Sequence, residues 1–302
     1  MNETTEIEET YSDRLLAFTL PARHARGRAV RLDGVLDTIL SAHDYPPVIT
    51  NLLAEALVMA ALLGSLMKEE GSQLTIQAQS PEGIVSLLVC DYRNGELRGY
   101  AEFDRDRLAP LGSNVSLPVL FAPDAHLAIT FDLPGGAGQR YQGIVPLEGA
   151  SLAEACEFYF ARSEQVPTLI RVGVRSGAEG CVAGGLLVQH LPEGEVGRER
   201  LHVRMDHPEW EHVAILAGST RHQELVDRDL SLEALVWRLF HEEDEIRTER
   251  GLPLTRGCRC TIEHFEKVLV RFPEEERAAM RADDGPIVVD CAFCSRLFPI
   301  YL

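Results

Sequence analysis

Alternating apolar and polar residues predict strands through the first two-thirds of this chain. Residues 74–79 and 126–132 each place apolar side chains at every second position, which is the spacing of a half-buried strand. Runs 84–92 and 97–103 lie on either side of Asn94-Gly95, a dipeptide that favours a tight hairpin turn. We therefore expect neighbouring antiparallel strands in this region.

Further patterns extend the same unit. Three more apolar runs indicate strands, at 141–147, 168–174 and 181–190. Ser151 followed by Glu154 is a capping box that starts a helix, and the most apolar stretch, 47–67, predicts a buried helix. We assign residues 1–192 to one domain of the α+β class, a mixed α/β core with antiparallel strands.

The composition changes after residue 192. Residues 193–255 carry 15 acidic and 8 basic side chains and few strand signals, so we expect a helical segment. Five apolar residues within it have the i, i+3, i+4, i+7, i+8 spacing of an amphipathic helix: Leu232, Leu235, Val236, Leu239 and Phe240. Trp237 lies beside this stripe. The simplest interpretation is that the stripe packs on the N-terminal domain. A more specific functional interpretation is that this packing is reversible.

The remaining residues, 256–302, form a small third unit. Phe272-Pro273 followed by three glutamates predicts a helix start, because Pro and acidic side chains suit a first turn. We expect this helix to end near Gly285 and a short strand to follow at 286–290. A unit of this size cannot bury enough apolar area to be stable alone, so it needs an additional staple, such as a structural metal ion or a disulfide.

Four of the seven cysteines lie in that small unit. Cys258 and Cys260 form a C-x-C pair, and Cys291 and Cys294 form a C-x-x-C pair. Two short segments with paired thiols are typical of a tetrahedral zinc site with four thiolate ligands. A site closed by four cysteines has no open ligand position, so we expect structural rather than catalytic zinc.

The other cysteines and the histidines are weaker candidates for functional residues. Cys90, Cys156 and Cys181 occupy apolar contexts, and we interpret them as packed core residues. His264 is an alternative ligand close to the first pair, but four cysteines already complete the set. Residues 135–138 are rich in glycine and lack the Lys-Ser/Thr of a phosphate-binding loop, so we expect a turn there.

Charge and apolar length exclude several classes of function. The formal net charge is −18, which repels nucleic acids and anionic membranes. The uncharged part of the most apolar stretch, 56–67, is too short to cross a bilayer. Residues 1–10 carry four glutamates and no basic residue, unlike a secretory signal. We therefore expect a soluble, cytoplasmic protein in a reducing compartment.

Zinc-bound thiolates are deprotonated and therefore open to oxidation. Their oxidation would remove the metal ligands, and zinc binding contributes roughly 10–16 kcal/mol of folding free energy in zinc-finger peptides. This matches or exceeds the roughly 5–15 kcal/mol stability of a whole domain. The cysteine pattern thus predicts a redox-sensitive unit without indicating what the unit controls.

Several short motifs precede the cysteine pairs in a specific order. They are His43-Asp-Tyr-Pro46 with Leu52-Leu53-Ala-Glu55-Ala56-Leu57, Leu97-Arg98-Gly99-Tyr100-Ala101, Tyr141-Gln-Gly-Ile-Val-Pro146, Tyr159-Phe160-x-x-Ser163-Glu-Gln165-x-Pro-Thr168 and Leu239-Phe240-His241-Glu242. Together with the cysteine pairs, these motifs resemble the heat shock protein 33 family of redox-regulated chaperones, from about Phe18 to Phe298. Thr261 departs from the Ser that usually follows the C-x-C pair in this family.

The resemblance implies an ATP-independent holdase chaperone with no catalytic residues. The reduced protein, with one Zn²⁺ on the four cysteines, would be inactive. Oxidation would form the disulfides Cys258–Cys260 and Cys291–Cys294, release zinc and unfold the linker. The exposed surface would then bind unfolding client proteins, usually as a homodimer. Residues 1–192 would be the chaperone core, 193–255 the redox-sensitive linker and 256–302 the zinc-binding redox switch.

Two other classes of function stay open from the residues alone. A zinc ribbon that binds nucleic acid needs a basic surface, whereas residues 256–302 carry seven basic and eight acidic side chains. A thiol–disulfide oxidoreductase would use Cys291-Ala-Phe-Cys294, but such enzymes place C-x-x-C at a helix start, and here the motif follows a predicted strand. Binding to DNA or RNA, or turnover of a model disulfide, would distinguish these alternatives.

Overall fold

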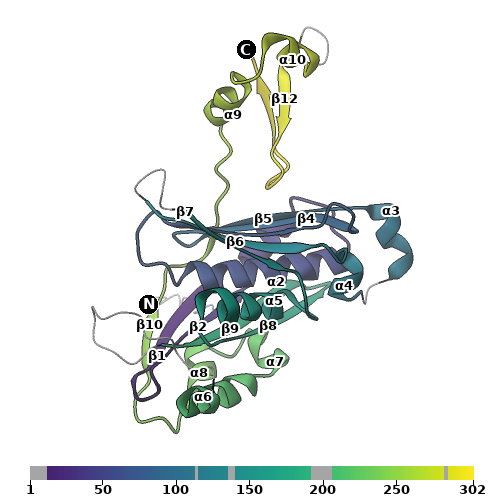
Figure 1. Ribbon diagram of the computed structural model, residues 1–302. Helices are drawn as coiled ribbons and strands as arrows, with labels where there is room; N and C mark the ends of the chain where they lie inside the picture. The colour runs from purple at the N-terminus through teal and green to yellow at the C-terminus, as the bar shows by residue number, and fades with distance from the viewer. Residues whose placement is uncertain (1–11, 113–114, 135–139, 192–205, 282–284) are drawn as a thin grey trace, which may run out of the picture.

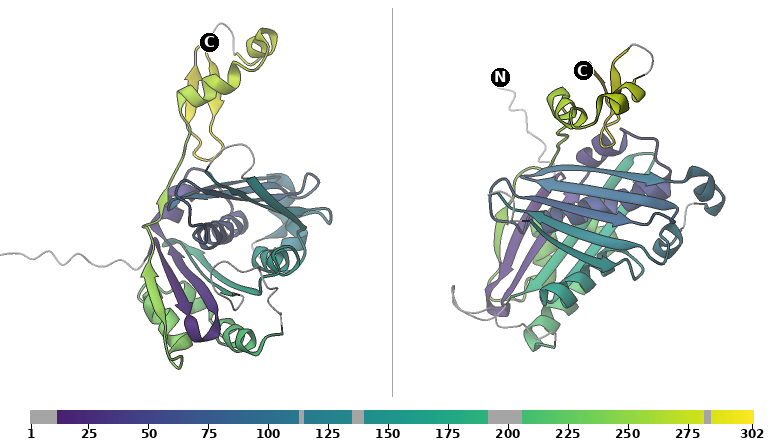
Figure 2. Two further views of the ribbon diagram at one scale, coloured as in Figure 1. Left: turned by 60° about the vertical axis from the view of Figure 1, so that its left-hand side comes forward. Right: turned by 45° about the horizontal axis from the view of Figure 1, so that its top comes forward.

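A computed structural model describes residues 12–112, 115–134, 140–191, 206–281 and 285–302. The described chain is arranged in layers (Figure 1). A long helix lies between two large sheets, further helices cover the outer face of one sheet, and a small C-terminal module stands on the outer side of the other. Figure 2 shows from two further directions that the module and the covering helices lie on opposite sides of the molecule.

The first sheet has five antiparallel strands in the order β10-β1-β2-β9-β8. Its strands are β1 (Arg14–Leu20), β2 (Ala25–Leu32), β8 (Thr168–Gly177), β9 (Gly180–His190) and β10 (Arg247–Arg250). β10 comes from the segment that we expected to be helical, and it pairs with β1 so that Leu16 lies opposite Arg250. The expectation was wrong there because all four residues of this edge strand are exposed, so they carry no apolar alternation.

The second sheet has six strands in the order β11-β5-β4-β3-β6-β7. Its strands are β3 (Gln73–Gln79), β4 (Val85–Arg93), β5 (Glu96–Phe103), β6 (His126–Asp132), β7 (Arg140–Pro146) and β11 (Thr255–Arg256). The predicted hairpin between β4 and β5 is confirmed, with positive φ angles of 48° at Asn94 and 84° at Gly95. β11 is the exception to antiparallel pairing, because it runs parallel to β5.

The helix α2 (Pro47–Gly64) lies between the two sheets and confirms the predicted buried helix. Its length and hydropathy alone would suit a membrane span, but 78% of it is buried inside the protein. Glu55 on α2 accepts a hydrogen bond from the Ala153 N–H at the start of α5 (Leu152–Tyr159), and Ser151 caps the same helix at the Glu154 N–H. The remaining short helical segments of this part of the chain are η1 (Pro21–Arg23), α1 (Gly34–Leu40), α3 (Arg105–Leu108), η2 (Ala109–Leu111), α4 (Leu117–Leu120) and η3 (Phe160–Glu164).

Three helices cover the outer face of the five-stranded sheet: α6 (Pro208–Gly218), α7 (His222–Leu225) and α8 (Leu232–Phe240). The apolar stripe predicted on α8 faces the sheet, and the Phe18 and Phe240 rings lie 5.7 Å apart. The side chains in this layer include Leu16, Phe18, Leu186 and Val188 from the sheet and Val213, Leu235, Val236 and Phe240 from the helices. Trp237 is 61% exposed, as its position beside the stripe predicts. Packing of the stripe on the N-terminal part is therefore confirmed.

The C-terminal module, which follows β11, contains α9 (Ile262–Leu269), α10 (Glu274–Ala279), β12 (Ile287–Asp290) and β13 (Leu297–Ile300). α10 ends at Ala279, earlier than we expected, and the Arg281 side chain that follows it donates a hydrogen bond to the Leu302 carbonyl at the other end of the module. Among the described residues of the module, its own apolar core is small: Leu269, Ile287 and Ile300 are buried, with Phe265, Val289 and Phe298 partly buried around them. A core this small supports the expectation that the module needs a staple.

Candidate metal centre and its seat on the core

The four cysteines of the C-terminal module come together in space. The Sγ atoms of Cys258, Cys260, Cys291 and Cys294 all lie within 4.8 Å of one another, and we call this group the cysteine cluster. Cys258 Sγ lies 3.2 Å from Cys260 Sγ and 3.6 Å from Cys291 Sγ, and Cys260 Sγ lies 3.5 Å from Cys294 Sγ. These separations exceed the roughly 2 Å of a disulfide bond, so all four are free thiols here.

A tight turn between β12 and β13 positions the second pair. The Cys291 carbonyl accepts the N–H groups of Cys294, at 3.1 Å, and Ser295, at 2.8 Å. Ser295 adopts a positive φ of 52°, which folds the chain back toward β13. The turn therefore points both thiols in one direction, without the helix start that a thiol–disulfide oxidoreductase uses.

The first pair lies between β11 and α9. Gly257 precedes it and packs so closely on the six-stranded sheet that an added Cβ would lie 2.4 Å from the Glu96 Cβ. Thr261 follows it and caps α9 by accepting the His264 N–H at 3.1 Å. Thr261 thus serves as a helix cap, a task that Ser also performs.

The cluster fits a tetrahedral zinc ion. Four Zn–S bonds of about 2.3 Å imply Sγ–Sγ separations of about 3.8 Å, in the middle of the observed range. Four thiolates are a soft ligand set that suits this metal, and they would hold it without an open position. His264, the alternative ligand, lies outside this group, and its ring packs against Phe265 at 5.7 Å.

Electrostatics distinguish the members of the cluster. Burial opposes the thiolate of Cys258, but hydrogen bonds from Cys260 and from the second pair outweigh burial and lower the pKa of Cys258 to about 7. Burial, together with the shared hydrogen bonds, raises the pKa of Cys260 and of Cys291. Four like charges cannot lie this close without a cation, so the metal-free cluster favours a single thiolate.

The other three cysteines are in different surroundings. Cys90, Cys156 and Cys181 are buried in the large core, as predicted. Burial raises the pKa of Cys90 and Cys156 strongly, and it raises the pKa of Cys181 to about 11. Because the thiolate is the reactive form, oxidants should attack the cluster before these residues.

The loop between the second pair of cysteines rests on the six-stranded sheet. The Phe293 ring centre lies 4.0 Å from the guanidinium carbon of Arg98, and the ring meets Tyr100 edge-on at 4.9 Å. Arg98 is itself held by a 2.7 Å hydrogen bond to Asp91 on the neighbouring strand. Asp91 also accepts a 2.6 Å hydrogen bond from the Thr75 hydroxyl. A ladder across three strands therefore forms the seat for Phe293.

Two further contacts join the module to the core. Arg259, between the first pair of cysteines, donates a hydrogen bond to Gln73, and Ser295 Oγ lies 3.1 Å from His43 Nδ1. Each cysteine pair thus carries a side chain that contacts the core. His43, Arg98 and Tyr100 lie in motifs that are visible in the sequence, but no local pattern predicts that they contact the module. The signal for this contact in the sequence is Phe293, an aromatic residue inside the C-x-x-C pair.

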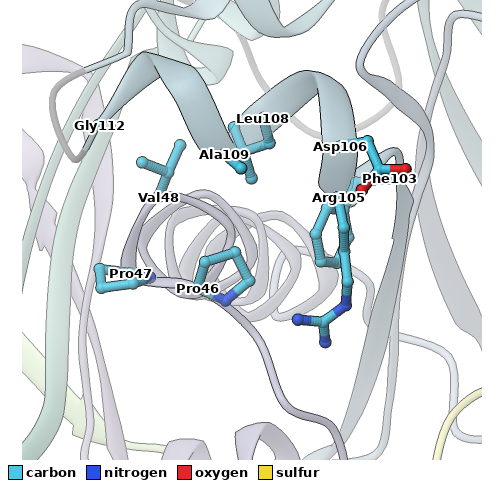
Figure 3. Close-up of a pocket in the computed structure, with 9 residues that line it drawn as sticks. All are labelled: Pro46, Pro47, Val48, Phe103, Arg105, Asp106, Leu108, Ala109 and Gly112. Atoms are coloured by element: carbon cyan, nitrogen blue, oxygen red, sulfur yellow. The ribbon is translucent and has the colours of Figure 1, made fainter.

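A separate pocket of about 440 Å³ lies at the start of α2 (Figure 3). Val48, Leu108 and Ala109 give it apolar walls, and Arg105 and Asp106 supply its charged groups. No cysteine or histidine is among its lining residues, so it does not share the chemistry of the cluster.

Comparison with known proteins identifies the family. Residues 13–300 match the family model described as Hsp33 protein. The 33 kDa chaperonin of Caulobacter vibrioides is 38% identical over 296 residues, covering 95% of this chain and 94% of that protein. The 33 kDa chaperonin of Azotobacter vinelandii is 36% identical over 274 residues, covering 90% and 86%.

A solved structure supports the fold. The crystal structure of the 33 kDa chaperonin of Thermotoga maritima, a heat shock protein 33 homologue, has a TM-score of 0.73. It covers 95% of this chain and 94% of the other, at 22% sequence identity. With the family model matching nearly the whole chain, this chain belongs to the Hsp33 family, a family of chaperones.

Proposed function

We propose that this chain is a redox-regulated, ATP-independent holdase chaperone and not an enzyme. In the reduced, inactive form the cysteine cluster holds one Zn²⁺. The observation that carries the proposal is the position of the cluster: four thiols converge in a module whose own apolar core is minimal and which rests on the larger core. A metal there supplies the folding free energy that the module lacks.

Oxidation is the proposed trigger. Two hydrogen peroxide molecules accept four electrons from the four cysteines and are reduced to water, while Cys258–Cys260 and Cys291–Cys294 form disulfides. The ligand set is then lost, and with it the main stabilising contribution to the module. Phe293 and Arg259 then lose their contacts with the six-stranded sheet, because each lies inside one of the two cysteine pairs whose geometry changes.

We propose that the linker detaches after the module has unfolded. β11 and β10 connect the module to α8, so loss of the module frees one end of the segment that covers the five-stranded sheet. The helices α6–α8 contribute only one side of that apolar layer. Their departure would expose the sheet residues Leu16, Phe18, Leu186 and Val188, which would then bind unfolding client proteins and prevent their aggregation.

In this proposal residues 1–192 are the chaperone core, 193–255 the linker and 256–302 the redox switch. We also propose that the active form is a homodimer, and that the protein works in the cytoplasm, where a reducing environment keeps it inactive until stress. The strongly negative net charge favours protein clients over nucleic acids.

The test couples two measurements on one sample. Hydrogen peroxide is added with mild heat, zinc release is followed with a chromogenic chelator, and aggregation of a chemically denatured test protein such as luciferase is followed by light scattering. We expect zinc release and suppressed aggregation together, both reversed by a thiol reductant. Retained zinc with unchanged aggregation would make the metal purely structural and would favour a binding module instead.

A further inference from the structure

A buried arginine joins the core to the linker. Arg31 on β2 is 0% exposed and points away from α2, toward the helices that cover the five-stranded sheet. Its guanidinium donates hydrogen bonds to three main-chain carbonyls, those of Leu225, Leu230 and Glu224. The bonds to Leu225 and Glu224 measure 3.0 and 3.1 Å. All three partners belong to the end of α7 and the loop before α8.

Two glycines extend this contact across the sheet. Arg31 lies opposite Gly184 on β9, and Gly184 lies opposite Gly173 on β8. A Cβ added at Gly184 would lie 2.1 Å from the Leu225 carbonyl oxygen, and one added at Gly173 would lie 3.0 Å from the His222 carbonyl oxygen. Because both glycines lack a side chain, the main chain around His222 and Leu225 lies directly on the sheet.

Arg31, Gly184 and Gly173 form a row across the sheet, and the chemistry of this row differs from that of its surroundings. Apolar side chains of α6 and α8 pack on the rest of the sheet face, whereas the row contacts carbonyl groups. Carbonyls are common to every peptide, so the row recognises a main chain rather than particular side chains. A buried guanidinium also requires such partners, because an unsatisfied buried charge is costly.

We propose that Arg31, Gly184 and Gly173 form a main-chain binding site for clients, which linker residues 224–230 occupy in the inactive protein. This inference rests on the proposed holdase function. When the linker leaves, the guanidinium loses three acceptors, and an unfolded client supplies carbonyls in their place. The neighbouring apolar residues then take the client's apolar side chains.

The site would select for the unfolded state. In a folded protein most main-chain carbonyls already accept hydrogen bonds, whereas an unfolded segment presents them to solvent. The partner class is therefore an extended, non-native polypeptide with apolar side chains, and its exact sequence matters little.

The experiment compares Arg31→Met with Arg28→Met. Arg28 is a matched control because it lies on the same strand and also donates to a carbonyl, that of Ser65 at the end of α2, on the opposite face. Peroxide-activated proteins are titrated with reduced, carbamidomethylated α-lactalbumin, which stays unfolded, and the Kd is measured by fluorescence anisotropy. We expect a Kd about tenfold higher for Arg31→Met, and no change for Arg28→Met.

A second measurement follows the linker in the reduced, zinc-loaded proteins. Trypsin cleavage after Arg228 and Arg238 should be faster in Arg31→Met, because the loop loses its clamp. Faster cleavage with unchanged client affinity would overturn the inference, since Arg31 would then hold only the linker. Unchanged cleavage and unchanged affinity would overturn it as well. If activated wild-type protein does not bind the unfolded probe, the proposed function fails first.

Arg31→Lys provides the comparison if Arg31→Met does not fold, as judged by circular dichroism. Lysine keeps the charge but has no planar fork to reach three separate carbonyls. We expect weaker client binding for this variant too, and wild-type affinity would overturn the inference.

Discussion

The guanidinium of Arg98 lies 4.0 Å from the ring centre of Phe293, so the six-stranded sheet holds the loop between two candidate zinc ligands. This contact links the state of the cysteines to the position of the module. A side chain in a metal-binding turn cannot keep its partner when the turn changes shape.

Replacing Phe293 should separate docking from metal binding. Phe293→Ala removes a cation–π contact and an aromatic pair, together worth about 1–2 kcal/mol. We expect faster hydrogen exchange at the Gly257 N–H, which donates to the Leu97 carbonyl at 2.9 Å, with unchanged zinc affinity. Phe272→Ala, in the same module but 38% exposed, is the control. Unchanged exchange at Gly257 would argue against the seat.

The cysteines should differ sharply in their effect on zinc. Cys258→Ser removes one of four ligands, about a quarter of the roughly 10–16 kcal/mol of binding, so zinc affinity should fall by roughly 60- to 700-fold. Cys90→Ser should leave zinc affinity unchanged, because Cys90 is buried in the large core. Competition with a chelator measures both. Loss of switching in Cys90→Ser alone would contradict the site assignment.

Metal removal should unfold one part of the chain. The described part of the module has only a small apolar core, built on Leu269, Ile287 and Ile300, so chelation of zinc should abolish hydrogen-exchange protection in α9, β12 and β13. The strands β3 and β6 should stay protected, because they belong to the large core around α2. Uniform protection before and after chelation would show that the module does not depend on metal.

The apolar layer beneath the linker should control activation. Phe240→Ala removes a fully buried ring, at a cost of about 3–5 kcal/mol. We expect the reduced variant to suppress aggregation at a lower temperature than the wild type, because the linker detaches more easily. Trp237→Ala, which changes an exposed neighbour on the same helix, should behave as wild type. Light scattering against temperature provides the comparison, and equal thresholds for all three proteins would rule out this role.

Glu55 should make stability depend on pH. Burial raises the pKa of Glu55 to about 7, so the folded protein binds a proton that the unfolded chain releases near pH 4.5. The free energy of unfolding should therefore decrease as pH rises through that window, by roughly 3 kcal/mol from this group. Glu55→Gln keeps an oxygen for the Ala153 N–H and removes the charge. Urea unfolding at pH 5 and pH 8 should show a gain for the variant at pH 8, and parallel curves would disprove it.

Local patterns in the sequence were sufficient for several features. The hairpin at Asn94-Gly95, the buried helix α2 and the stripe on α8 each follow from residues that lie close together in the chain. The cysteine pairs were equally readable, since their spacing is itself the signal for a metal site. The cluster geometry agrees with that prediction.

Tertiary structure alone decided which distant residues meet. Arg31 appears in the sequence as one more charged residue, yet the fold buries it against carbonyls about 194 positions away. β10 has only exposed residues, so its place beside β1 depends on the edge that β1 offers. Phe293 likewise meets Arg98 and Tyr100, about 195 positions earlier in the chain, only because the fold brings them together. Periodicity reports which face of an element is apolar, whereas pairing between elements depends on the shape and hydrogen-bonding groups of the assembled surface.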